Sequence, residues 1–251
     1  MNLPESTIVI VFDITNSVVY YNKDNTMEHV PAGHYGMNQA TAMFPSYVEY
    51  TKSGIVVGKD AKNDFGKKNK FVVAVAKGII RQTYEEYEKM KDKSIFGCEV
   101  VRGDDGYPYF IVSEDGKRVT PIEVASELFK VMKQEADASA TTKFTQAYVI
   151  VAATLKDQQC KAIKKAAELA GLKVLKLVTE PIASVMPWFL SNILKVGDSM
   201  MVYDFGGSTH GVSLIQYKGD MEFVVGAVDG NPNLGGNDID NAILDHMVKK
   251  C

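Results

Sequence analysis

The sequence is poor in the residues that build disulfide and zinc sites. It has three cysteines (Cys98, Cys160 and Cys251) and four scattered histidines among 251 residues. An odd number of isolated cysteines is typical of reduced thiols in a cytosolic protein and not of a disulfide framework. Structural zinc sites need several cysteine or histidine ligands at short spacings, and no such cluster occurs. We therefore exclude a disulfide scaffold and a structural zinc fold.

The chain also lacks a basic excess and long apolar runs. Its net charge of −3 gives no surplus of lysine and arginine to neutralise phosphates, so we expect no nucleic acid partner. It has no run of about 18 apolar residues that could cross a membrane, so we expect no membrane partner either. The N-terminus has no basic segment followed by an apolar one, which predicts no signal peptide. With 46% hydrophobic residues, these features predict a soluble, cytoplasmic α/β protein.

Local signals predict several helices and strands. Thr120, Pro121 and Glu123 form a capping box with proline at the first helical position, which predicts a helix to about Asp137. The order of strand 147–152, helix 157–170 and strand 172–178 predicts a βαβ unit with parallel strands and a right-handed crossover. Further predictions are a hairpin at 47–57, a surface helix at 81–93, a strand meander at 100–112 and an irregular segment at 24–42.

The most informative feature is a sequence pattern that occurs twice. Residues 8–17 and 200–209 are each an apolar strand that ends in an acidic residue, Asp13 or Asp204, and continues into small or turn-forming residues. An aspartate at a strand end can hold a hydrated metal ion, while the backbone N–H groups of the turn face phosphate oxygens. The repeat indicates two related lobes around one nucleotide; a pair of ordinary hairpins is the alternative.

Four motifs resemble those of the 70-kDa heat-shock chaperone family. They keep the order and separations of that family and together cover essentially the whole chain. They are Phe44–Val48, Val178–Ser184, Val202–Thr209 and Leu234–Asn241.

The resemblance implies the actin-like ATPase fold, with two ribonuclease H-like α/β lobes around a nucleotide cleft. It implies a first lobe at residues 1–188 and an incomplete second lobe at 189–251. The rest of the subdomain that clasps adenosine, the closing helices and the peptide-binding domain are then absent, so the chain is interpreted as an N-terminal fragment of a divergent member.

The resemblance also assigns roles to individual residues. Asp13 and Asp204 hold magnesium, largely through water, with potassium as a second ion. Lys77 approaches the γ-phosphate and the attacking water, and Glu180 helps to organise that water. The nucleotide, ATP or ADP, is bound by two turns and a glycine pair: Thr15, Asn16, Ser17, Gly206, Gly207, Ser208, Thr209, Gly235 and Gly236. Asp238 and Asp240 are interpreted as acids of a first helical turn.

The chain departs from the family pattern in the first turn, where Thr15, Asn16 and Ser17 replace a glycine and two threonines, and at four further positions. Thr15 places a β-branched side chain where the backbone should approach phosphate, and at a site that could require a positive φ. Ser208 replaces a glycine, and Gly211 replaces an acidic residue near the metal. Ala152 replaces a proline that relays the nucleotide state, and Pro187 lies inside a predicted helix. Because hydrolysis depends on positioned water and charge, these changes threaten its rate more than the fold.

Two functions remain open at this point. The first is a stress-responsive, ATP-dependent chaperone whose partners are a J-domain co-chaperone, a nucleotide exchange factor and unfolded polypeptide bound by the missing C-terminal domain. The second is a divergent scaffold or co-chaperone that hydrolyses ATP weakly or not at all. Another actin-like enzyme, such as a sugar kinase, is a remote third.

Overall fold

The computed structural model describes residues 4, 6–24, 26–36, 42–68, 71–74, 76–90, 93–231 and 234–250. The chain divides into two compact units. Unit 1 comprises Met1–Val149 and Leu155–Leu177, and unit 2 comprises Ile150–Thr154 and Val178–Cys251. These units are defined by contacts; the lobe boundary between residues 188 and 189 stays a prediction.

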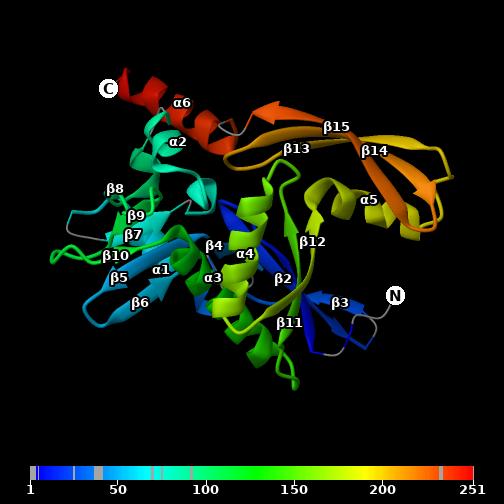
Figure 1. The fold of residues 1–251 in the computed structure, drawn as a ribbon, viewed down its shortest axis with the longest axis horizontal. Helices are drawn as coiled ribbons and strands as arrows, with labels where there is room; N and C mark the ends of the chain where they lie inside the picture. The colour runs from blue at the N-terminus through cyan, green and yellow to red at the C-terminus, as the bar shows by residue number, and fades with distance from the viewer. Residues whose placement is uncertain are drawn as a thin grey trace. The chain divides into compact units, whose positions relative to one another are not determined.

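Unit 1 is built on a mixed sheet whose described strands run in the order β12-β11-β1-β2-β3, with β4 paired to β2 (Figure 1). β1, β2 and β3 are antiparallel neighbours. The amide of Gln146 donates to the Ser6 carbonyl (3.1 Å), and the amide of Lys173 donates to the Thr145 carbonyl (2.8 Å). The strands β1, β11 and β12 therefore start at the same end of the sheet, as the predicted parallel βαβ unit requires. The bounds are β1 Thr7–Val11, β2 Asn16–Lys23, β3 Thr26–His29, β4 Phe44–Pro45, β11 Gln146–Val151 and β12 Lys173–Thr179.

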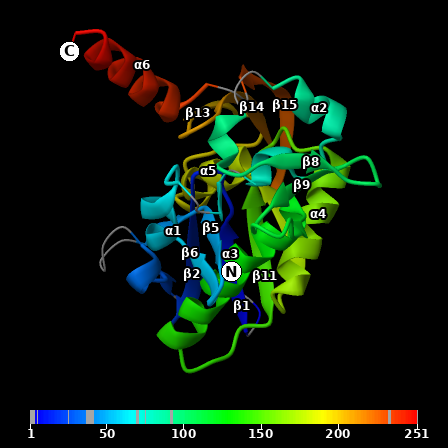
Figure 2. The same cartoon turned by 90° about the vertical axis from the view of Figure 1, so that its left-hand side faces the viewer.

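Two long helices of unit 1 begin and end where the sequence predicts. α3 spans Pro121–Ser139, and its N-cap Thr120 accepts from the amide of Glu123 while the Glu123 carboxylate accepts from the amide of Thr120. α4 spans Asp157–Leu169 and ends before Gly171, whose φ of 79° is the left-handed conformation expected after a helix. α3 and α4 pack against each other. Figure 2 allows both helices to be followed beside β1, β2 and β11.

Two smaller sheets and several short helices complete the described part of unit 1. The sheets have the orders β6-β5-β7 and β10-β9-β8, and they contain the predicted hairpin and meander. The strands are β5 Tyr47–Thr51, β6 Gly54–Val57, β7 Phe71–Ala74, β8 Val100–Arg102, β9 Pro108–Ile111 and β10 Arg118–Val119. The helices are η1 Gly33–Tyr35, α1 Lys59–Asp64, η2 Ala76–Ile79, α2 Tyr84–Glu88 and η3 Ser94–Phe96.

Two local predictions in this region need correction. In the described part of segment 81–93, the predicted helix is present but shorter than predicted: α2 has five residues, because Arg81 has a φ of 56°, outside the right-handed region, and Thr83 caps the helix two residues later. The segment predicted as irregular, 24–42, contains strand β3, which has few apolar residues and is held by its pairing with β2.

The core of unit 1 is apolar and closely packed. Phe12 stacks on Phe129 of α3 with ring centroids 4.6 Å apart, and both are fully buried. The inward face of α3 is buried at Ala125, Leu128, Phe129 and Met132, whereas Ile122 is only half-buried. Burial raises the pKa of the Cys98 thiol to about 12, and neither Cys98 nor Cys160 forms a disulfide. The Cys98 thiol is therefore unreactive near neutral pH.

Unit 2 contains an antiparallel sheet of β13, β14 and β15 with two helices. Phe189 of α5 contacts the rings of Tyr217 and Phe223 on one face of this sheet. On the other face, Met201 and Tyr203 are 72% and 63% exposed. No helix in the described part of the chain is long and apolar enough to span a membrane. The bounds are α5 Glu180–Leu190, β13 Ser199–Phe205, β14 His210–Gly219, β15 Glu222–Asn231 and α6 Gly236–Val248.

Candidate nucleotide site

The first aspartate turn connects β1 and β2, which are antiparallel, and is held by two serines. Asp13 lies two residues after the end of β1. Its amide donates to Ser17 Oγ (3.3 Å), and its carbonyl accepts from Ser46 Oγ (3.1 Å). The Ser46 amide also donates to the Thr15 carbonyl (3.0 Å). Ser17 and Ser46 are both buried, so the turn is fixed from its inner side by polar groups.

These bonds determine which way the backbone N–H groups of the first turn point. In a trans peptide the C=O and the following N–H point in opposite directions, and the described chain has no cis peptide bond. Because the carbonyls of Asp13 and Thr15 point toward Ser46, the N–H groups of Ile14 and Asn16 point away from it. Thr15 does not have a positive φ, so the anticipated strain is absent, and that expectation was wrong.

The second aspartate turn connects β13 and β14, also antiparallel. Asp204 lies inside the ladder, opposite Gly211, and the last paired residues are Phe205 and His210. The turn is closed by the Gly206 amide, which donates to the Thr209 carbonyl (2.8 Å). Both aspartate segments are therefore hairpins, so the alternative interpretation describes their local geometry correctly.

The second turn rests on the start of α6. The Gly236 amide donates to the Gly206 carbonyl (3.0 Å), and the Asn237 amide donates to the Gly207 carbonyl (2.8 Å). A Cβ added at Gly235 would lie 2.6 Å from the Gly207 carbonyl carbon and from the Ser208 amide nitrogen, so only glycine fits here. The structure thus brings the predicted residues 206–209 and 235–236 together.

The same geometry creates two parallel donors. Because the carbonyls of Gly206 and Gly207 point to α6, the N–H groups of Gly207 and Ser208 both point away from it. Successive N–H groups that face the same side form an anion-binding concavity. The Asn237 side chain donates to Ser208 Oγ (3.1 Å). This bond fixes the side chain of Ser208, the residue that stands where the family pattern has a glycine.

The predicted helix acid Asp238 supports this arrangement. Its carboxylate accepts from the Gly235 amide (2.8 Å), and its own amide donates to the Gly235 carbonyl (3.1 Å). Asp238 therefore caps α6 and fixes the glycine turn, as its interpretation as a first-turn acid predicts.

Lys77 and Glu180 lie at element boundaries. The backbone of Lys77 belongs to η2, shortly after β7, and its side chain lies outside what the structure describes. Glu180 is half-buried and is the first residue of α5, directly after β12. A carboxylate at a helix N-terminus is stabilised by the helix dipole.

The departures have different structural consequences. At Gly211 an added Cβ would meet nothing within 4 Å, so the strand has room for a side chain. α5 continues past Pro187 to Leu190, although proline cannot donate to the carbonyl of Ala183. Ala152 follows the last residue of β11 and precedes the turn before α4.

Among the described residues, no group of three or more acidic, histidine or cysteine side chains could hold a metal ion by itself.

Comparison with known proteins decides the family. The sequence model of the Hsp70 protein family matches residues 10–251. The chain belongs to the Hsp70 family. Chaperone protein DnaK from Burkholderia cenocepacia (strain HI2424) and from Burkholderia orbicola (strains MC0-3 and AU 1054) is in each case 29% identical over 238 residues. The match covers 93% of this chain and 36% of each relative, so the chain spans about a third of their length.

This result confirms the resemblance seen in the sequence motifs and excludes the sugar-kinase alternative. The chain is an Hsp70-type nucleotide-binding domain, and its described architecture is mixed α/β. The residue roles stay predictions, because neither the comparisons nor the geometry tests them.

Sequence reasoning missed the residues that support the two turns. Ser46 lies in a motif that was noticed, but the motif gives no sign that its hydroxyl reaches Asp13, 33 residues earlier. Asn237 likewise lies in the glycine motif, and its bond to Ser208 spans 29 residues. Only the tertiary arrangement brings these partners together.

Proposed function

We propose that this chain binds ATP and ADP as the nucleotide-binding domain of an Hsp70-type chaperone. The observation that carries the proposal is the pair of N–H groups of Gly207 and Ser208, directed to one side and fixed by α6. We further propose that units 1 and 2 correspond to the ribonuclease H-like lobes of the actin-like fold, the second of them incomplete.

In unit 2, the turn 206–209 is proposed to bind phosphate oxygens. Two aligned N–H groups supply positive partial charge without a mobile side chain, so they favour an anion without reorganisation. Thr209 and Ser208 add hydroxyl donors. Gly235 and Gly236 are proposed to lie near the ribose and phosphates, and the close contact at Gly235 keeps the turn in its binding shape.

In unit 1, the residues Thr15, Asn16 and Ser17 are proposed to contact phosphate oxygens of the nucleotide. The N–H groups of Ile14 and Asn16 point away from Ser46, which supports this role. Because Thr15 has no positive φ, its side chain costs no backbone strain.

Asp13 and Asp204 are proposed to hold magnesium through bound water, with potassium as a second ion. Carboxylate oxygens are the ligands that magnesium prefers, and both aspartates end or follow a strand beside a turn. Magnesium, when bound, neutralises phosphate charge. Glu180 is proposed to orient the attacking water, and Lys77 to lie at the γ-phosphate.

We propose that turnover is slow. Gly211 lies directly opposite Asp204, so no second carboxylate stands beside it at this cross-strand position. Phosphoryl transfer depends on positioning and charge, and a lost positioning group lowers the rate while binding survives. This observation favours the second candidate function, a weakly hydrolysing scaffold or co-chaperone.

The relatives' name, chaperone protein DnaK, supports a chaperone role for the protein to which this chain belongs. A J-domain co-chaperone, a nucleotide exchange factor and unfolded polypeptide are the proposed partners. A stress-responsive role and a cytoplasmic location are proposed with them.

A single-turnover experiment tests the proposal. Labelled ATP and magnesium are mixed with the protein and with Lys77→Ala, and bound nucleotide and released phosphate are recorded together. We expect binding by both proteins, and slow phosphate release that Lys77→Ala abolishes. Binding without any release supports the scaffold, whereas absence of binding to the wild-type protein overturns the proposed function.

A further inference from the structure

The helical turn that carries the Lys77 backbone is anchored to the core on its apolar side. Ala76 is 4% exposed, and Ile79 and Ile80 are fully buried. The turn packs against α3. This packing fixes the depth of η2 in unit 1 but provides no directional bond that sets its position along the surface.

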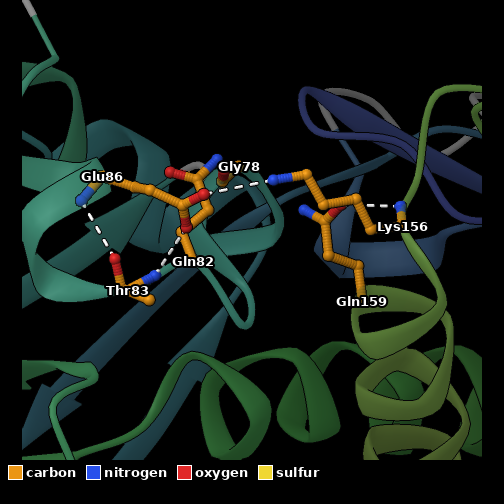
Figure 3. Close-up of polar contacts among 6 residues, drawn as sticks. All are labelled: Gly78, Gln82, Thr83, Glu86, Lys156 and Gln159. Carbon is orange, nitrogen blue, oxygen red and sulfur yellow. Dashed lines mark hydrogen bonds and ion pairs between the residues drawn. The ribbon is translucent and has the colours of Figure 1, made fainter.

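On its polar side, η2 is bonded to the segment that leads into α2 (Figure 3). Gln82 Nε2 donates to the Gly78 carbonyl (2.7 Å), and the Gln82 amide donates to the Ile79 carbonyl (3.1 Å). The next residue, Thr83, caps α2 and accepts from the Glu86 amide (3.2 Å), while its own amide donates to the Glu86 carboxylate (2.8 Å). The position of Glu86 is thereby linked to that of the turn.

Glu86 also reaches a helix 70 residues further along the chain. Its second carboxylate oxygen pairs with Lys156 Nζ at 3.1 Å (Figure 3). Lys156 is the N-cap of α4, and its amide donates to Gln159 Oε1 (3.0 Å). The pKa of Glu86 is lowered, first by the Thr83 amide and then by Lys156. Glu86 thus joins α2 and the start of α4.

Lysine is an unfavourable residue at this position of α4. Helix N-termini favour side-chain acceptors at the N-cap and negative charge nearby, and an ammonium provides neither. Glu86 compensates, because its carboxylate balances the Lys156 charge close to the helix end. The lysine at the N-cap of α4 is therefore explained by its ion pair with Glu86 and not by helix capping.

We propose that the Glu86–Lys156 pair is a positioning pair that sets the Lys77 turn relative to the start of α4, and so tunes recognition of the γ-phosphate. The inference rests on the proposed function, in which Lys77 lies at the γ-phosphate. Loosening the pair should therefore affect ATP and leave ADP unaffected, since ADP lacks that group.

The experiment measures ATP and ADP affinity, with magnesium, for Glu86→Gln, Lys156→Met and the double variant. Glutamine keeps the capping box and removes only the charge. Exposed pairs contribute little, so we expect roughly two- to fivefold weaker ATP binding in each single variant. We expect no further loss in the double variant, unchanged ADP affinity and recovery in Lys156→Arg.

The neighbouring ion pair on the same helix supplies a matched control. Glu85 pairs with Arg102 of β8 at 2.8 Å and has no bond to α4. Glu85→Gln and Arg102→Met should leave both affinities unchanged. Equal losses in these controls, or an unchanged ratio of ATP to ADP affinity in Glu86→Gln and Lys156→Met, would overturn the inference.

Amide hydrogen exchange separates this inference from the proposed function. We expect faster exchange of the amides of 78–82 in Glu86→Gln and Lys156→Met but not in Glu85→Gln, with or without nucleotide. If the wild-type protein binds no nucleotide, the proposed function fails and the role toward the γ-phosphate fails with it. Unchanged exchange overturns the positioning itself, even where nucleotide binds.

Discussion

The two aspartate turns differ in what holds them. In unit 1 the turn after Asp13 is fixed by side-chain hydroxyls, chiefly that of the buried Ser46. In unit 2 the turn after Asp204 is fixed mainly by backbone groups, through the bonds from the first residues of α6 and the close approach of Gly235, with one side-chain bond from Asn237 to Ser208. The two aspartate turns have similar sequences but are stabilised by different interactions, so different substitutions should disrupt them.

The position of the aspartate differs as well. Asp13 lies in the connection, beyond the last paired residues Val11 and Val18, whereas Asp204 is itself paired within the ladder. In the second turn the two N–H groups that point to the same side belong to the adjacent residues 207 and 208, and in the first turn they belong to residues 14 and 16. The second turn therefore presents the more compact pair of donors, and the first turn depends more on its serines.

The largest expected effect comes from Gly235→Ala. The new methyl group would lie 2.6 Å from the backbone of Gly207 and Ser208, so the turn or α6 must shift. We expect a loss of about 1–3 kcal/mol in unfolding free energy and roughly tenfold weaker nucleotide binding. Thermal unfolding and calorimetric titration with ATP measure both.

Gly236→Ala is the control for this variant, because a Cβ there meets its nearest neighbours at 3.9 Å. It should therefore keep the unfolding free energy of the wild-type protein. An unchanged unfolding free energy in Gly235→Ala would show that the backbone contact does not shape the second turn.

Ser46→Ala should have a smaller effect, confined to the first turn. It removes the donor to the Asp13 carbonyl and leaves that group without this bond, at a cost of about 1 kcal/mol. We expect a lower melting temperature and a moderate loss of magnesium-dependent ATP affinity. Ser53→Ala, at the exposed tip of the β5–β6 hairpin, is the control and should change neither quantity. If the two variants behave alike, the first turn does not depend on its serine.

Gly211→Asp should have the smallest effect on stability. It would test whether the absence of an acidic side chain at position 211 makes turnover slow. The strand has room for the side chain, but it would stand directly opposite Asp204. Like charges at such positions are destabilising, so without magnesium we expect a loss of roughly 0.2–1 kcal/mol.

Magnesium should restore this stability, and phosphate release in single turnover should become faster. Gly211→Asn, which has nearly the same shape and no charge, separates charge from packing. A faster release in Gly211→Asn than in Gly211→Asp would contradict the electrostatic explanation of slow turnover.

Local signals predicted much of the fold and less of the site. Thr120, Pro121 and Glu123 specify the start of α3 because a capping box needs only four consecutive residues. The helix predicted at 81–93 starts too early, because the left-handed conformation of Arg81 cannot be recognised from charge and aromatic spacing. The backbone of Gly207 and Ser208 that Gly235 approaches lies 28 and 27 residues earlier in the chain, and Lys156 lies 70 residues after Glu86, so no local pattern could identify these contacts.

The open space at Gly211 has an evolutionary consequence. A glycine codon becomes an aspartate codon by one nucleotide change, and here the backbone would accept the new side chain without rearrangement. The first turn is constrained differently, because Asn16 and Ser17 are paired with Pro45 and Phe44 of β4. A single substitution can therefore place a carboxylate opposite Asp204, whereas a change at Asn16 or Ser17 also acts on the pairing of β2 with β4.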